Sequence, residues 1–477
     1  MSVRGGVLST ERAAIILLVL VALLISGPIW GPGMINTRGG GDSPFLLQRL
    51  DQVVVNMRSG VFPARWMPDA AYGLGYPFFN YYSALPYYLG GLFVLLGLDI
   101  LTTLKLIQTL GFVAAALAMF GWMRGHTRSA WAAWLAAVAY TAAPFHLVNV
   151  YVRGDSLSEF YAFIFYPLIL WGLDRALAAT STQTGAWTRI RSPLSMWSAG
   201  FSRSAVWLWP ALAYAGLIAS HNISALIFSP FVGLYVVCVS LGQRRVAGRM
   251  LFTGVLALGM GIVLTAWVSL PALLERASVQ SDMLTGGYFH YTQHFRTMDL
   301  VQWRPFFVYD IGSTGETPFA MGLAQAVLTI AGGAVLVARV LRRQAGVVDV
   351  FILVGLLLST LMITPLSELA WRHLPLLPTI QFPWRFLSVQ ALFTAATTVA
   401  LIPERGPHRG ASLAAPIAAM IIAAVLVPLR PERLSINPED VTTERLQLYE
   451  LFTENIGTTI RYEWLPRAVA PRPFTSE

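Results

Sequence analysis

The sequence is poor in charged residues and has a single cysteine, and each scarcity excludes a class of protein. Only 12% of its 477 residues are charged and 56% are hydrophobic, whereas soluble domains carry about 25% charged residues. A chain this long and this apolar does not fit a soluble core, so it belongs in a bilayer. The lone cysteine, Cys238, excludes an intrachain disulfide and a thiolate metal cage.

Binding of nucleotides and of nucleic acid has no support in the sequence. No phosphate-binding loop of the GxxxxGK[ST] type occurs, so no nucleotide cofactor is predicted. The net charge of +9 does not indicate a nucleic-acid partner, because the arginines lie in short loops between apolar runs. That distribution is typical of membrane topology. We therefore expect membrane lipid, and not nucleic acid, as a partner.

Apolar runs divide the chain into segments that are long enough, or nearly so, to cross a bilayer. About twelve such segments occur, near residues 12–30, 82–98, 101–123, 131–148, 160–177, 206–220, 223–241, 251–270, 319–339, 349–366, 386–402 and 411–429. The first lacks a small-residue cleavage site and is interpreted as a retained helix, not a signal peptide.

The placement of arginine predicts the topology. Arg4 and Arg12 put the N-terminus in the cytoplasm, and every later arginine cluster falls on the same side only if one net crossing occurs between residues 81 and 124. We therefore expect an all-α polytopic membrane protein with about eleven transmembrane helices and one short, tilted or re-entrant segment within 82–101. The N-terminus is then cytoplasmic and the C-terminus outside.

This topology predicts four regions. They are residues 1–30 with the first transmembrane helix, a first outer loop at 31–81, a transmembrane core at 82–429 and an outer tail at 430–477. Outer loops at 149–159, 271–318 and 367–385 interrupt the core. All polar stretches without arginine clusters share the outer side, so the chemistry is expected there. The tail belongs either to a short protein or to one truncated before a soluble domain.

The stretch "GDSPFLLQRL" raises a question about Asp42 and Arg49, seven residues apart in the first outer loop. Asp42 or Ser43 suits a helix N-cap, and Pro44 suits the first turn. The following apolar stripe predicts an interfacial amphipathic helix on the outer leaflet. Asp42 is thus either a helix cap or a catalytic carboxylate, and Arg49 either contacts headgroups or binds a donor phosphate.

A second polar stretch, "YVRGDSLSEFYA", contains Arg153, Asp155 and Glu159. The two carboxylates are four residues apart and share one helical face. Such a pair either divides acid and base roles or holds a hard cation. The alternative is a helix N-terminus whose acidic residues complement the dipole.

Two further polar side chains interrupt apolar surroundings on the predicted outer side. His221 lies in "SHNISAL", in a short turn between two apolar segments. Arg385, in "IQFPWRFL", lies at the mouth of a crossing helix, where a planar guanidinium suits phosphate oxygens. The alternatives are a structural histidine and an arginine that extends to the interface.

Several of these stretches together resemble a known family. "GDSPFLLQRL", "FPARWMPDAAYGLGYPFFNYYSALPYYLGGLF", "YVRGDSLSEFYA", "SHNISAL", "IQFPWRFL" and "GTTIRYEWLPR" resemble bacterial membrane proteins labelled "6-pyruvoyl-tetrahydropterin synthase-related, membrane domain". These proteins look like members of the GT-C superfamily of polytopic glycosyltransferases. The sequence contains no soluble domain and no zinc-binding histidine cluster that would support pterin chemistry.

The resemblance implies a glycosyltransferase of the bacterial inner membrane. Its donor would be a polyprenyl-phosphate sugar, and its acceptor an envelope glycan or protein outside the cell. Asp42 would be the early-loop carboxylate and Asp155 or Glu159 the second acidic residue. Positive or polar side chains would bind the donor phosphate: Arg385, Arg49, His221 and Arg153. A divalent cation at Asp42, Asp155 and Glu159 is left open, because Asp42 lacks the paired acid of metal-using members.

Two alternatives come from other functional classes. A transporter or flippase of lipid-linked sugars should have internal repeats and ionisable residues at mid-membrane, and neither is evident in the sequence. A non-catalytic envelope scaffold would keep the fold without its acidic site. The acidic residues in the outer loops favour the enzyme over the scaffold.

Overall fold

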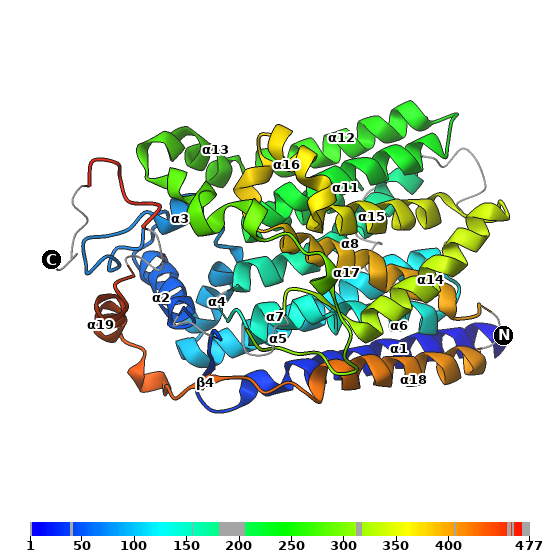
Figure 1. Cartoon of the computed structure of the whole chain (residues 1–477), viewed down its shortest axis with the longest axis horizontal. Helices are drawn as coiled ribbons and strands as arrows, with labels where there is room; N and C mark the ends of the chain where they lie inside the picture. Colours follow the sequence, from blue (N-terminus) through cyan, green and yellow to red (C-terminus); the bar gives the residue numbers. More distant parts are fainter. Residues whose placement is uncertain are drawn as a thin grey trace.

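The computed structural model describes residues 2–38, 42–154, 156–180, 206–311, 317–404, 407–455, 459 and 462–469. Nearly all regular structure in these ranges is helical. The long helices run roughly parallel to one axis (Figure 1). They are α1 (Ser2–Ser26), α5 (Ile100–His126), α6 (Ala130–Thr141), α7 (Pro144–Tyr151), α8 (Leu157–Thr180), α10 (Leu208–Ser220), α11 (Asn222–Leu241), α12 (Ala247–Leu264), α14 (Leu323–Leu341), α15 (Val347–Ile363), α17 (Leu387–Thr397) and α18 (Pro407–Leu426).

The predicted fold class, an all-α polytopic membrane protein, is confirmed. Among the described residues, eight helical segments are long and apolar enough to cross a membrane, or nine if the bent pair Val347–Ile363 and Pro365–His373 is one span. The predicted number of about eleven is larger because two predicted segments form shorter helices. These are α10 with 13 residues and α17 with 11 residues, which a 3₁₀ turn extends.

The segment within 82–101 that was expected to be short, tilted or re-entrant forms a short helix. Residues 82–98 contain only α4 (Leu85–Leu95), whose 11 residues extend about 16 Å at 1.5 Å per residue. Gly90 and Gly91 allow α4 to pack closely on α2 (Pro44–Arg58), because a Cβ at Gly91 would meet the Met57 side chain. The helix therefore supports the first outer loop and is too short to span a bilayer alone.

The centre of the molecule is a bundle of small and aromatic residues. Helix α6 is buried along nearly its whole length, and α5 packs against α1, α6 and α8. Alanines on α6 let its neighbours approach closely, as is common between membrane helices. By contrast, α1 and α18 lie side by side at one edge (Figure 1), and each has large exposed apolar side chains, which suits contact with lipid.

The loop at residues 31–81 forms the expected helix, but that helix is buried. Helix α2 begins at Pro44, as predicted, and Ser43 occupies the N-cap position without making a side-chain cap hydrogen bond. Its polar residues Arg49, Gln52 and Asn56 are buried together with its apolar ones. Asn56 and Gln52 bond to the backbone at Trp66 and Asp69, because the loop folds back over the polar face of the helix.

The tail after α18 returns to this first loop. Strand β4 (Arg433–Leu434) pairs antiparallel with β1 (Met34–Ile35), and α19 (Thr443–Thr453) packs against α2. The buried Glu450 carboxylate accepts hydrogen bonds from the backbone N–H groups of Ala71 and Tyr72. Residues nearly 400 apart in sequence therefore form one cap at the end of the molecule opposite the N-terminus (Figure 1).

Candidate functional site

A polar cavity of about 250 Å³ lies under this cap. It is formed where α2, α8 and α11 meet the loop before α17. Five of the seven predicted site residues line it: Arg49, Arg153, Glu159, His221 and Arg385. These residues come from four separate stretches of sequence, and the fold brings all of them to one place.

Glu159, in the first turn of α8, is at the centre of the charge arrangement. Its Oε2 lies 2.6 Å from Nη1 of Arg153 and 3.6 Å from Nε of Arg385. The carboxylate is nearly inaccessible to solvent, and a buried charge is retained only when it is paired and hydrogen-bonded. Glu159 therefore orients two guanidinium groups beside the cavity.

Arg385 is held by an unusual turn. Its Nη1 donates to the carbonyl of Ile380 at 2.9 Å, and that carbonyl also accepts from the Phe382 N–H at 2.7 Å. Gln381 between them has φ +66° and ψ −48°, the geometry of a classic γ-turn, which is rare and strained for a residue other than glycine. Strain of this kind is maintained only by surrounding contacts, so the turn fixes Arg385 in place.

All three arginines of the cavity lie against aromatic rings. Arg49 is 4.9 Å from the ring centroid of Phe78, Arg153 is 5.3 Å from that of Trp384, and Arg385 is 5.1 Å from that of Phe382. Such stacking compensates part of the cost of removing a guanidinium from water.

His221 is neutral in this environment. It lies between α10 and α11, outside both helices, where its Nδ1 accepts from the Ser224 N–H at 3.2 Å. Burial is the main cause that lowers the pKa of His221 to about 3; the nearby Glu159 carboxylate opposes this shift, and the guanidinium groups of Arg385 and Arg153 add to it. Because Nδ1 is an acceptor, the proton of the neutral ring is on Nε2, which is then a hydrogen-bond donor.

The other two predicted carboxylates are placed differently. Asp42 precedes α2 and is not among the residues that line the cavity; its charge acts on Tyr449 of α19. Asp155 lies outside the described residues. Its partner in the predicted pair, Glu159, is engaged with arginine instead. The roles of Asp42 and Asp155 stay predictions.

The donor set at Glu159 does not suit a divalent cation. No group of three or more His, Cys, Asp or Glu side chains with metal-binding geometry occurs within the described residues. Two guanidinium groups already occupy the Glu159 carboxylate, and a cation there would be repelled by both. The described part of the cavity is instead suited to an anion.

Polar and aromatic residues that were not predicted from the sequence also line the cavity, and three of them come from the tail and from the loop before α17. Glu463 and Trp464 come from the tail, and Gln381 comes from the strained turn. The ring of Trp464 stacks on that of Tyr81 with centroids 4.6 Å apart and planes 9° apart. The motif "YEWLPR" marked this part of the tail as distinctive, but nothing in the sequence placed it beside Glu159.

An apolar groove of about 570 Å³ adjoins the polar cavity. The short helix α3 (Phe78–Tyr81) separates them: Phe78 and Tyr81 line the polar side, Phe79 and Asn80 line the groove, and Tyr82 lines both. The groove is otherwise lined mainly by side chains of the first loop and α4, together with Trp267 of α13 (Ala266–Glu275). A molecule with an anionic head and an apolar chain would fit the two sites together.

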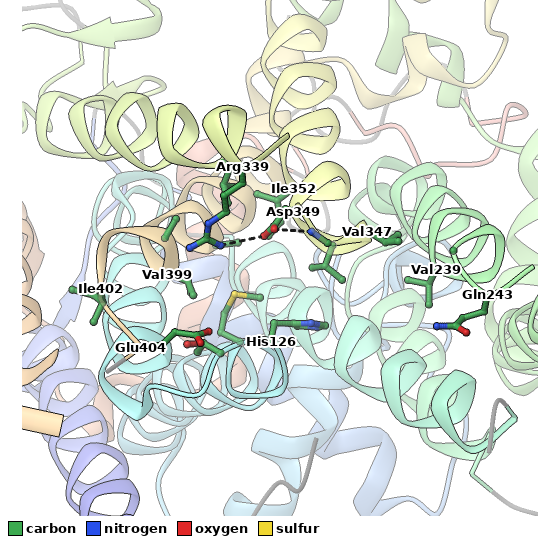
Figure 2. A pocket seen from close by; sticks show the side chains of 18 residues that line it. His126, Val239, Gln243, Arg339, Val347, Asp349, Ile352, Val399, Ile402 and Glu404 are labelled. Carbon is green, nitrogen blue, oxygen red and sulfur yellow. Dashed lines mark hydrogen bonds and ion pairs between the residues drawn. The ribbon is translucent and has the colours of Figure 1, made fainter. Parts of the chain in front are cut away.

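A second cavity, of about 290 Å³, lies at the other end of α11 (Figure 2). Helix α11 starts at the first cavity and ends at the second, and its 20 residues correspond to about 30 Å. Arg339 and Asp349 point toward each other across this cavity, 3.7 Å apart (Figure 2). None of the predicted site residues lies there.

Comparisons with known sequences give little information on activity. No family model matches the chain, so the narrower family predicted from the motifs stays a prediction. An uncharacterized protein of Lactococcus lactis subsp. cremoris (strain MG1363) is 22% identical over 264 residues, which are 54% of this chain and 39% of that protein.

Comparisons with solved structures reveal the fold. The Archaeoglobus fulgidus oligosaccharyltransferase tethered with an acceptor peptide superposes with a TM-score of 0.51 at 14% identity, over 92% of this chain and 55% of that one. The same organism's AglB in complex with an inhibitory peptide and a dolichol-phosphate gives 0.50 at 14%, over 95% and 58%. The mycobacterial arabinofuranosyltransferase AftD gives 0.50 at 15%, over 91% and 27%.

This chain thus spans little more than half of the oligosaccharyltransferase and about a quarter of AftD. At such identities the similarity is one of fold. The chain is a multi-pass membrane protein with the fold of GT-C-type glycosyltransferases, as its motifs had predicted.

Proposed function

We propose that this protein is a membrane glycosyltransferase that moves a sugar from a polyprenyl-phosphate donor to a cell-envelope acceptor. The observation that carries the proposal is the cluster of three stacked arginines around Glu159, beside an apolar groove. The cluster fits the anionic part of such a donor, and the groove fits its hydrocarbon part.

The donor phosphate would bind to Arg385, Arg153 and Arg49. Guanidinium groups match phosphate oxygens with two parallel N–H donors, and three of them against Glu159 and Glu463 leave the cavity with a net positive charge. The Nε2–H of His221 adds a neutral donor. Because the groups are fixed before the donor arrives, they need little reorganisation as the reaction proceeds.

The prenyl chain would leave the cavity past α3. Tyr82 lines both sites, so a phosphate at Arg49 lies next to the entrance of the groove. The groove is lined by Leu85, Leu89 and Leu92 of α4 among others. Burial of apolar surface in such a groove gives about 25 cal/mol per Å² and favours long-chain donors over soluble sugar phosphates.

Sugar transfer breaks the bond between the anomeric carbon and the phosphate oxygen. The electron pair of that bond goes to the phosphate, so negative charge grows there in the transition state. Arg385 and Arg153 would stabilise this charge. The acceptor hydroxyl forms the new bond to the anomeric carbon and gives up its proton.

The alternative of a transporter is less consistent with the interior. A substrate crossing the membrane would have to pass along α11 between the two cavities. Buried aromatic rings fill this region, with Phe231 and Phe393 5.7 Å apart and Tyr235 and Phe351 4.7 Å apart. In the described part of the chain, these rings separate the two cavities.

Transfer of radiolabelled sugar from a panel of polyprenyl-phosphate donors to envelope extract tests the proposal. Arg385→Ala should lower transfer about 10²–10³-fold, the usual effect of removing one preorganised donor to a developing anion. Arg372→Ala is the matched control, because Arg372 pairs with Glu368 on the surface and should leave transfer unchanged.

Arg385→Lys separates charge from geometry. It keeps the positive charge and loses the planar pair of donors, so an intermediate rate is expected. Equal transfer by Arg385→Ala and wild type would overturn the role of this cavity. Movement of intact donor across proteoliposomes without any sugar transfer would favour the transporter.

A further inference from the structure

The tail segment 462–469 forms one wall of the polar cavity. Tyr462 has φ +55° and starts a turn that is closed by the Leu465 N–H bonding to the Tyr462 carbonyl at 2.9 Å. The following residues bridge to 278–280, where Val279 pairs with Pro466. The wall is therefore held by the hydrogen bond of the turn and by backbone hydrogen bonds that join Leu465 and Arg467 to residues 278–280.

Glu463 lies at the point of this turn that faces the cavity. Its neighbour Trp464 is fixed twice, by stacking on Tyr81 and by its backbone N–H, which donates to the Tyr76 hydroxyl at 3.0 Å. The Glu463 carboxylate thus sits next to a rigid residue. It is half-buried and lines the same cavity as Glu159.

Two carboxylates line the cavity, Glu159 from α8 and Glu463 from the tail. Glu159 receives two guanidinium groups, which favour its ionised form and make it a poor proton acceptor. The face formed by Tyr81 and Trp464 lies beside Glu463 in the same cavity. Flat aromatic surfaces of this kind pack against the apolar C–H face of sugar rings.

We propose that Glu463 is the general base of the transferase and that the Tyr81–Trp464 wall holds a carbohydrate acceptor beside it. This inference rests on the proposed function. The acceptor hydroxyl would give its proton to a Glu463 carboxylate oxygen as its own oxygen bonds to the anomeric carbon. The bond from that carbon to the phosphate breaks, and its electron pair leaves on the phosphate beside Arg385.

In this proposal the donor and the acceptor bind to different sides of the cavity, and the tail folds back across the first loop to form the acceptor side. The donor side is built by Arg49, Arg153 and Arg385, and the acceptor side by Tyr81, Glu463 and Trp464. Asp42, the early-loop carboxylate predicted to be catalytic, precedes α2 and does not line the cavity. The sequence separates the two sides by hundreds of residues.

The test compares Glu463→Gln with wild type in nanodiscs, using radiolabelled polyprenyl-phosphate donors and alkyl glycosides as acceptors. Loss of a general base should lower kcat about 10²–10⁴-fold while the affinity for the donor stays unchanged. The decrease of kcat at acidic pH, the acidic limb of its pH profile, should also disappear in Glu463→Gln. If Glu463 had only a structural role, this decrease would remain. Glu463→Asp should restore part of the rate.

Two matched variants complete the test. Glu444→Gln changes an exposed carboxylate of the same tail and should behave as wild type. Asp42→Asn should keep the acidic limb. If wild type is active and Glu463→Gln has the same kcat, this inference is overturned and the proposed function is not. The same holds if the acidic limb of the kcat pH profile is lost in Asp42→Asn but kept in Glu463→Gln. Inactive wild type with every donor and acceptor would overturn it together with the proposed function.

Discussion

Each of the two cavities at the ends of α11 contains arginine paired with a carboxylate, but the two differ in how far these side chains are exposed to solvent. In the polar cavity, Arg153 and Arg385 meet Glu159, and the Glu159 side chain is 3% exposed. In the second cavity, Arg339 meets Asp349 with side chains 39% and 23% exposed (Figure 2). The first pair is enclosed by protein, and the second is in contact with solvent.

This difference supports the proposal that the polar cavity, and not the second cavity, is the functional site. A buried ion pair costs desolvation energy, and replacing it by apolar residues is often neutral or stabilising. Retaining three stacked arginines and two carboxylates in one small cavity is therefore hard to explain by stability. The exposed Arg339–Asp349 pair has little cost, and Asp349 also accepts from the Gly346 N–H at the start of α15.

The largest expected effect is a loss of stability when the buried Glu159 carboxylate is removed. Glu159→Ala would leave two guanidinium groups without their shared carboxylate and should lower the free energy of unfolding by about 3–5 kcal/mol. Asp349→Ala removes an exposed pair and a helix cap and should cost about 1 kcal/mol. Unfolding in mixed micelles measures both. Equal losses would contradict the contrast between the cavities.

A backbone position beside the polar cavity should be the next most sensitive. Gly154 has φ +61°, and a Cβ there would overlap the Ser43 and Thr37 hydroxyls, which bond to each other at 2.8 Å. Gly154→Ala should cost roughly 3 kcal/mol from strain and overlap. Gly125→Ala, near the second cavity, has no neighbour within 4 Å and should be neutral; thermal melts of the two variants compare them.

The smallest effect is a pH dependence from His221. Its pKa falls from the ordinary 6.5 to about 3 on folding, so the unfolded chain binds an extra proton between these values. Stability is therefore lost as pH falls below about 6.5, by about 2 kcal/mol between pH 7 and 5.

His221→Asn retains a capping side chain for α11 and cannot titrate. The difference in unfolding free energy between wild type and this variant should change with pH in that window. A difference that stays constant from pH 7 to 5 would mean that His221 does not bind a proton on unfolding, contrary to the buried position described here.

The sequence predicted the donor side of the site better than the acceptor side. Arg153, Glu159, His221 and Arg385 were identifiable because polar residues at the ends of apolar helices are costly and rare. Their convergence follows from the bundle, since the affected helix ends all reach the same end of it. Periodicity also indicated α2, but not that its polar face would be buried under residues 60–76.

The remaining features depend on contacts that no local pattern contains. Glu463 and Trp464 reach the cavity through pairing of the tail with 278–280, and the Gln381 turn depends on the surrounding loops. Two-residue strands such as β1 and β4 have too few residues for an alternation to be recognised. Tertiary contacts alone determine these parts.

The bonds from Glu450 to Ala71 and Tyr72 span 379 and 378 positions and have a consequence for biosynthesis. At 5–20 residues per second, a ribosome needs roughly 20–80 s to make the intervening chain. During this time the buried backbone donors of the first loop have no carboxylate to bind. The cavity is therefore completed only after nearly all helices have been made, so a chain with a misplaced helix would fail to assemble it.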